Sequence, residues 1–110
     1  MNLTNNGVEL TLTYIEPTQN EDNSQLDDLH HTSIYYSLDA GTTAVHVIDL
    51  PASLMTGGGE IAYSFSAPVL PGQSVDMLIW ATATDASDNT SAPSERLTKR
   101  IDRIAPKPPF

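Results

Sequence analysis

Apolar and polar residues alternate along most of this chain. The first alternating stretch, residues 8–14, reads Val-Glu-Leu-Thr-Leu-Thr-Tyr. A period of two is typical of a half-buried β-strand, because successive side chains of a strand point to opposite faces of the sheet. Further stretches of the same kind predict strands at residues 31–37, 43–50, 61–65, 75–83 and 97–101. No segment shows the period of about 3.6 residues of an amphipathic helix, and we therefore expect an all-β fold.

The segments between these predicted strands are rich in residues that favour turns. Longer loops are expected at residues 16–30, 51–59 and 85–93, and tight turns at Asp39-Ala40-Gly41 and Leu70-Pro71-Gly72. Three consecutive glycines, Gly57 to Gly59, predict that the second loop is mobile or sharply bent. About six or seven short strands joined in this way predict a β-sandwich. A length of 110 residues is that of one domain.

The alternation in the strand at 75–83 assigns its side chains to two faces. Val75, Met77, Ile79 and Ala81 are expected to point into the core. Leu78 and Trp80 then point outward, and so does Tyr35 on the neighbouring strand. Trp and Tyr are enriched where proteins bind one another, so these three residues form a candidate partner-binding patch. Two alternatives stay open: ordinary surface aromatics, or a face that the protein's own loops or tail shield.

The charges are divided unevenly along the chain. All five Lys and Arg residues lie in the last 15 positions, whereas every acidic residue except Asp102 precedes them. We expect a sandwich domain at residues 1–102 and a basic, proline-rich, extended tail at 103–110. A pre-extended segment with one aromatic anchor loses little entropy on docking, and a frayed terminus is the alternative. The candidate docking residues at this end are Arg100, Arg103, Lys107 and Phe110.

Composition excludes several classes of function. A formal net charge of −9 argues against binding of nucleic acid by the body and against anionic membrane surfaces. The absence of cysteine excludes disulfides and thiolate metal sites. No apolar run approaches a membrane span, and residues 1–10 do not resemble a signal peptide, so a complete, unprocessed product is expected. No phosphate-binding loop or nucleophile elbow is present, and we expect no enzyme.

Two groups of residues could hold a metal ion. If the loops at 16–30 and 85–93 lie at one pole, their carboxylates and the side chains of Asn20, Asn23 and Asn89 could bind Ca²⁺. The alternative, which we favour, is a solvated acidic surface and no cofactor. His30 and His31 are adjacent on an extended segment and are expected to point to opposite faces, so they should not chelate one ion. The acidic loop residues are Glu21, Asp22, Asp27, Asp28, Asp85 and Asp88.

Residues 8–14 with Pro17, residues 19–36 and residues 82–94 form three stretches that together resemble a fibronectin type III domain of the kind found in bacterial and phage proteins. Residues 8–14 with Pro17 resemble the B strand of that family, with Tyr14 in the place of a core aromatic. Residues 19–36 resemble the B–C loop and C strand, and residues 82–94 the end of strand F, the F–G loop and the entry to strand G. Val75 departs from the pattern, since the family usually has a tyrosine there. The resemblance implies an immunoglobulin-like sandwich of about seven strands with a binding or spacer role and no shared catalytic residues.

These features together suggest a non-enzymatic structural module. We expect an accessory or decoration protein of a bacteriophage virion, made in the host cytoplasm and attached to the capsid or tail. Its partners would be other virion structural proteins, and several copies would occupy symmetric positions. The alternative is an extracellular module that binds carbohydrate or a cell surface and belongs to a larger secreted protein. A spacer stiffened by calcium is a third reading.

Overall fold

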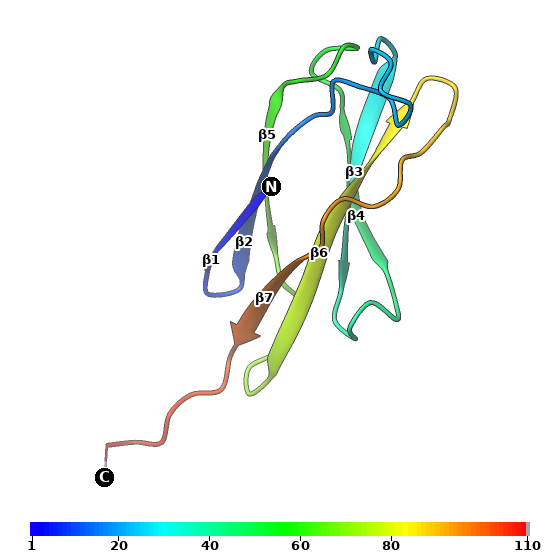
Figure 1. Ribbon diagram of the computed structural model, residues 1–110. Coiled ribbons are helices and arrows are strands. Elements are labelled where there is room, and N and C mark those ends of the chain that lie inside the picture. The colour runs from blue at the N-terminus through cyan, green and yellow to red at the C-terminus, as the bar shows by residue number, and fades with distance from the viewer. Residues whose placement is uncertain (110) are drawn as a thin grey trace.

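The computed structural model describes residues 1–109 and contains seven β-strands and no helix within that range (Figure 1). It accordingly has no apolar helix long enough to cross a membrane among these residues. The strands are β1 (Asn2–Asn6), β2 (Glu9–Ile15), β3 (Leu29–Ser37), β4 (Val45–Pro51), β5 (Glu60–Ser66), β6 (Ser74–Asp85) and β7 (Leu97–Asp102).

The strands form two antiparallel sheets with their apolar faces turned to a shared core. One sheet has three strands in the order β1-β2-β5, and the other has four in the order β4-β3-β6-β7. The expected all-β, sandwich-like structure is therefore confirmed. The alternation had not predicted β1, because Leu3 is its only apolar residue. This strand forms instead by pairing with β2 across a turn at Gly7, where φ is +63°.

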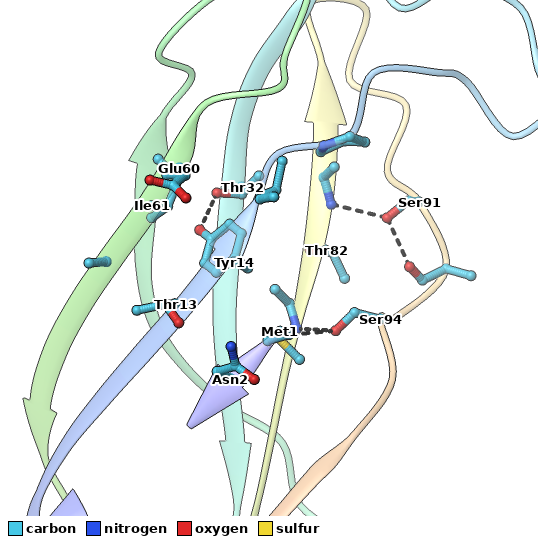
Figure 2. Close-up of a pocket in the computed structure, with 16 residues that line it drawn as sticks. Met1, Asn2, Thr13, Tyr14, Thr32, Glu60, Ile61, Thr82, Ser91 and Ser94 are labelled. Atoms are coloured by element: carbon cyan, nitrogen blue, oxygen red, sulfur yellow. Dashed lines mark hydrogen bonds between the residues drawn. The ribbon is translucent and has the colours of Figure 1, made fainter. Parts of the chain in front are cut away.

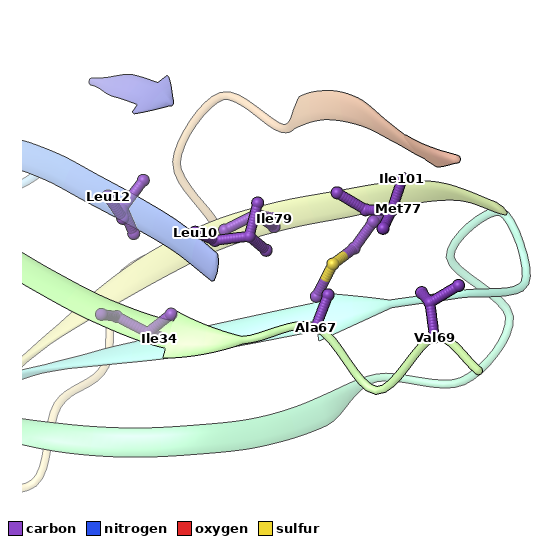
Figure 3. Packing of buried hydrophobic residues seen from close by; sticks show 8 residues of the cluster. All are labelled: Leu10, Leu12, Ile34, Ala67, Val69, Met77, Ile79 and Ile101. Carbon is purple, nitrogen blue, oxygen red and sulfur yellow. The ribbon is translucent and has the colours of Figure 1, made fainter. Parts of the chain in front are cut away.

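The core lies between the two sheets (Figure 3). Its side chains come from β2, β3, β6, β7 and the segment that follows β5, and the cluster comprises Leu10, Leu12, Ile34, Ala67, Val69, Met77, Ile79 and Ile101. The predicted inward face of β6 is confirmed. Met77 and Ile79 are fully buried, Ala81 is nearly so, and Val75 packs against the cluster from its margin.

The two ends of the molecule differ in what they carry (Figure 1). One end, here called the loop end, holds the connections 16–28, 52–59 and 86–96. The opposite end holds the turns at 38–44 and 67–73, and the chain leaves the body there after β7. The last residues extend away from the sandwich and contribute to an overall length of 62 Å against widths of 26 and 19 Å.

Candidate functional site

The predicted aromatic patch lies on the outer face of the four-stranded sheet, but it is largely covered. Tyr35 and Trp80 are in register on β3 and β6, and their rings stack with centroids 6.0 Å apart. The guanidinium of Arg96 lies 5.0 Å from the centre of the Trp80 ring. Only 5% of Trp80 is exposed, which agrees with the alternative of an outward face that the protein's own chain shields. Tyr35 covers Trp80 from the neighbouring strand β3. Arg96, which directly precedes β7, covers the Trp80 ring as well. Partner binding by this face stays a prediction.

Two further predicted residues lie on the same outer face, nearer the end where the chain leaves the body. Leu78 is half-buried beside the turn at Gly41. Arg100 is paired with Asp76, its register partner on β6, through two hydrogen bonds of 2.9 and 3.0 Å. The hydrogen bonds from Arg100 to Asp76 raise the pKa of the guanidinium. Both side chains are more than half exposed, so the pair contributes little to stability.

Arg103 is fastened to the body, although we expected the tail to begin there. Its N–H donates to the carbonyl of Gln73 and its own carbonyl accepts from Gly72, which extends the pairing beyond β7. Its guanidinium donates to the carbonyl of Val69 at 2.7 Å. The segment that projects from the body therefore begins at Ile104. Lys107 lies on it and is exposed, whereas Phe110 lies outside the described residues.

The structure brings together the two acidic loops, as the sequence predicted. The N–H of Ala86 donates to the carbonyl of Asp28 at 2.9 Å, and Ala92 N–H donates to the carboxylate of Glu21 at 3.3 Å. These loops line a cleft of about 590 Å³. Among residues 1–109, no three His, Asp or Glu side chains are arranged to hold a metal ion. The solvated acidic surface, without a cofactor, stays a prediction for this end.

Some of these carboxylates organise their own loops. Asp85 accepts hydrogen bonds from Ser87 N–H and from both the main chain and the side chain of Asn89, at 2.9 to 3.0 Å. The Asn89 side-chain bond is the main cause that lowers the pKa of Asp85. Asp22 is held in the same manner by Ser24, whose hydroxyl lowers the pKa of Asp22. A carboxylate used in this way shapes the loop that carries it.

A buried carboxylate that the sequence analysis missed fixes the third loop of this end. Glu16 is 2% exposed and follows β2 directly. It accepts hydrogen bonds from the N–H and hydroxyl of Ser53 and from the N–H of Gly59. Of the two forms expected for the 51–59 loop, mobile or sharply bent, the structure has the bent one, which these hydrogen bonds fasten. The only sign of this buried carboxylate in the sequence is a Glu directly before Pro17, at the end of an apolar strand.

A second cleft, of about 860 Å³, opens between the two sheets (Figure 2). It lies beyond the start of β1 and the start of β7, toward the loop end. Tyr14 and Thr32 face each other across it and share a hydrogen bond between their hydroxyls. Burial raises the pKa of Tyr14. On the side of the cleft formed by β6, Ser91 and Ser94 pair with β6 in the place of a neighbouring strand. Each donates its N–H to a carbonyl of β6 and accepts the N–H of the same β6 residue on its hydroxyl.

The two adjacent histidines lie differently from their prediction. His30 and His31 do not point to opposite faces, because their Nδ1 atoms are 2.7 Å apart and their rings meet edge to face. The cause is an irregularity at the start of β3. Leu29 pairs with Asp85 and His31 with Thr84, which leaves His30 without a register partner on β6.

Comparison of the chain with protein-family models, with curated proteins and with solved structures returned no match.

Proposed function

We propose that the chain is a fibronectin type III-like module that acts without catalysis, as an accessory protein attached to the capsid or tail of a bacteriophage particle. In this proposal the end with the projecting segment binds the particle and the loop end faces outward. Several copies would sit at symmetric positions among other virion structural proteins.

The arrangement of the strands supports the fold part of this proposal. The first, second and fifth strands form one sheet, and the remaining four form the other. If β2, β3, β6 and β7 are the strands B, C, F and G of that family, its B–C and F–G loops should share one pole. The connections 16–28 and 86–96 do contact each other at the loop end. Tyr14, the residue that resembles the family's core aromatic, packs against the core cluster.

The observation that carries the attachment role is the separation of charge between the two ends. The loop end carries Glu21, Asp22, Asp27, Asp28, Asp85 and Asp88 on connections that meet there. All Lys and Arg residues lie at or after position 96, on the approach to β7, on β7 itself or beyond it. Opposite charges on opposite ends orient a molecule as it approaches a charged partner. An acidic surface on the particle would therefore select the tail.

The projecting segment has the form of a docking peptide. Residues 104–109 carry three prolines and Lys107 in an extended conformation without strand pairing. Ile104 is 59% exposed and offers an apolar contact next to the body. Since proline restricts the free chain beforehand, binding such a segment costs little conformational entropy.

The alternative role, binding of carbohydrate, would use flat aromatic faces open to a sugar ring. The single Trp of the chain, Trp80, is 5% exposed and lies between Tyr35 and Arg96. The sheet face as it stands is better suited to protein contact through Leu78 and the polar groups around it than to stacking on a sugar.

The proposal predicts that a chain ending at Ile104 folds but fails to join the particle. This cut leaves the main-chain pairing of Arg103 with Gly72 and Gln73 intact. The variant is expected to melt at the temperature of the native chain, because residues 105–109 are exposed and form no strand pairing. Its amount in purified particles, measured by quantitative mass spectrometry after growth on a host that supplies the variant, should fall to a small fraction of the native amount.

A matched variant keeps the length of the tail and removes its proline, lysine and phenylalanine side chains. Residues 105–110 are replaced by glycine and serine, and this variant should be lost from particles as the truncated chain is. Undiminished incorporation of the truncated chain would disprove attachment through the tail. Absence of the native chain from the particles would disprove the virion role itself.

A further inference from the structure

The start of β3 brings two imidazole nitrogens into direct contact with each other. Nδ1 of His30 and Nδ1 of His31 are 2.7 Å apart, and one ring donates a hydrogen bond to the other. The rings are nearly perpendicular, at 81°, with centroids 5.0 Å apart. His30 is exposed and His31 is half-buried, so solvent reaches the pair. Neighbouring side chains converge like this on a strand only where its pairing is irregular, as it is between Leu29 and His31.

Hydrogen bonds on both sides hold the backbone that carries the pair. The carbonyl of His30 accepts from Ala52 N–H at 3.0 Å, and Leu29 N–H donates to Met55 at 2.9 Å. Just before them, the carbonyl of Asp28 accepts from Ala86. Loops from two other parts of the chain thus fix the two Cα positions. A ligand that binds both rings would find them already close together, which reduces the entropy that binding must overcome.

The spacing of the two nitrogens selects a coordination geometry. Two nitrogens bound to one metal at about 2.0 Å lie about 2.8 Å apart when the angle at the metal is a right angle, and about 3.3 Å apart when it is tetrahedral. The observed 2.7 Å matches the right angle. Square-planar sites with nitrogen and oxygen ligands are those of Cu²⁺ and Ni²⁺, and Cu²⁺ is the stronger binder of the two.

We propose that His30 and His31 form a chelating site for Cu²⁺, with both Nδ1 atoms as adjacent ligands in the plane of the ion. A small rotation of the exposed rings turns both lone pairs toward the ion, and each neutral ring then carries its proton on Nε2. The protein supplies these two nitrogens as ligands, and water can occupy the other positions in the plane of the ion. An open position of this kind lets a bound ion take a further ligand from another molecule.

The charge around the pair favours a cation. The chain has a formal net charge of −9, and Asp27 and Asp28 precede the pair in sequence, separated from it by Leu29. Such a field raises the local concentration of divalent ions. The third histidine, His46, lies on β4 and is engaged with Asp49, 2.7 Å from its Nε2; the Asp49 carboxylate also interacts electrostatically with His31. His46 therefore provides a control within the same chain.

The experiment is a titration of the untagged full-length chain with Cu²⁺ in a buffer that does not bind metal. We expect one Cu²⁺ per chain and an electron paramagnetic resonance spectrum with splitting from two nitrogens. His30→Gln and His31→Gln should each weaken binding about a hundredfold, because the second imidazole binds at high effective concentration once the first is attached. His46→Gln should bind as the native chain does. Zn²⁺ should bind more weakly than Cu²⁺.

Two further measurements keep the outcome decisive. Sub-stoichiometric Cu²⁺ should broaden the nuclear magnetic resonance signals of His30 and His31 in the native chain before those of His46, which needs no variant to fold. Acetylation of the Met1 amine should leave the affinity unchanged. Native-like binding by either histidine variant would overturn the proposal, and so would loss of binding on acetylation. Splitting from a single nitrogen would do the same.

Discussion

At the scale of single residues, hydroxyl groups and a few carboxylates form most of the polar side-chain contacts, a role that ion pairs fill in more highly charged proteins. Charged residues make up 17% of the chain, and among residues 1–109 a Lys or Arg pairs with a carboxylate only at Arg100 and Asp76. Hydroxyls satisfy buried or edge groups instead, as Tyr14 does with Thr32 and as Ser91 and Ser94 do along β6. No buried side-chain nitrogen or oxygen in that range lacks a partner. The abundance of Ser and Thr therefore follows from how the strands end.

Glu16 is the residue on which the loop end depends most. Its carboxylate, 2% exposed, accepts three hydrogen bonds from Ser53 and Gly59. Glu16→Ala should lower the free energy of unfolding by about 1–3 kcal/mol, because the substitution removes the acceptor of three part-buried hydrogen bonds. Urea unfolding at neutral pH measures this loss. Glu60→Ala removes an exposed carboxylate nearby and should change stability by less than about 0.5 kcal/mol. Equal losses in the two variants would show that the Glu16 network contributes nothing.

At the scale of elements, the 52–59 loop shows why its glycines are needed. Gly57 has φ of +71°, and a Cβ placed there would lie 1.7 Å from the carbonyl oxygen of Pro17. Gly7, in the β1–β2 turn, has φ of +63° with nothing within 4 Å of such a Cβ. The two positions share a backbone conformation and differ in the space around it.

The comparison of Gly57→Ala with Gly7→Ala separates these two effects. Gly7→Ala should cost about 1 kcal/mol, the strain of a left-handed residue alone. Gly57→Ala should cost clearly more, because the loop must also move away from the Pro17 carbonyl. The difference in melting temperature between the two variants measures the cost of the close approach. Similar melting temperatures would mean that the loop yields freely and is not fastened as described.

The elements that the sequence could predict are those whose apolar residues alternate. The strands β2 to β7 meet that condition, and the inward face of β6 follows from it. β1 does not, since only its pairing with β2 makes it a strand. Trp80 was assigned to the correct face, but its cover by Arg96 depends on the path of the chain before β7. The convergence of His30 and His31 depends on a pairing irregularity that leaves no mark on the alternation.

At the scale of the whole molecule, the division of charge along the chain becomes a partial division between two ends, since Asp39, Asp76 and Asp102 lie toward the end where the chain leaves the body. The acidic loops lie at one end, and the basic residues run along β7 and out of the other (Figure 1). The boundary differs from the expected one by a single residue, because Arg103 is bonded to Gln73 and Val69. The sequence predicted the division of charge. The strand order then places the acidic loops and the basic residues of β7 and the tail at a distance from each other.

The orientation of the chain in its assembly tests the central claim most directly. A cryo-electron microscopy map of the particle that carries the chain would show which end touches the neighbouring protein. We predict that residues 104–109 lie buried against that neighbour and that the 16–28 and 86–96 loops face outward. Loops buried in the contact, with the projecting segment in solvent, would contradict the account.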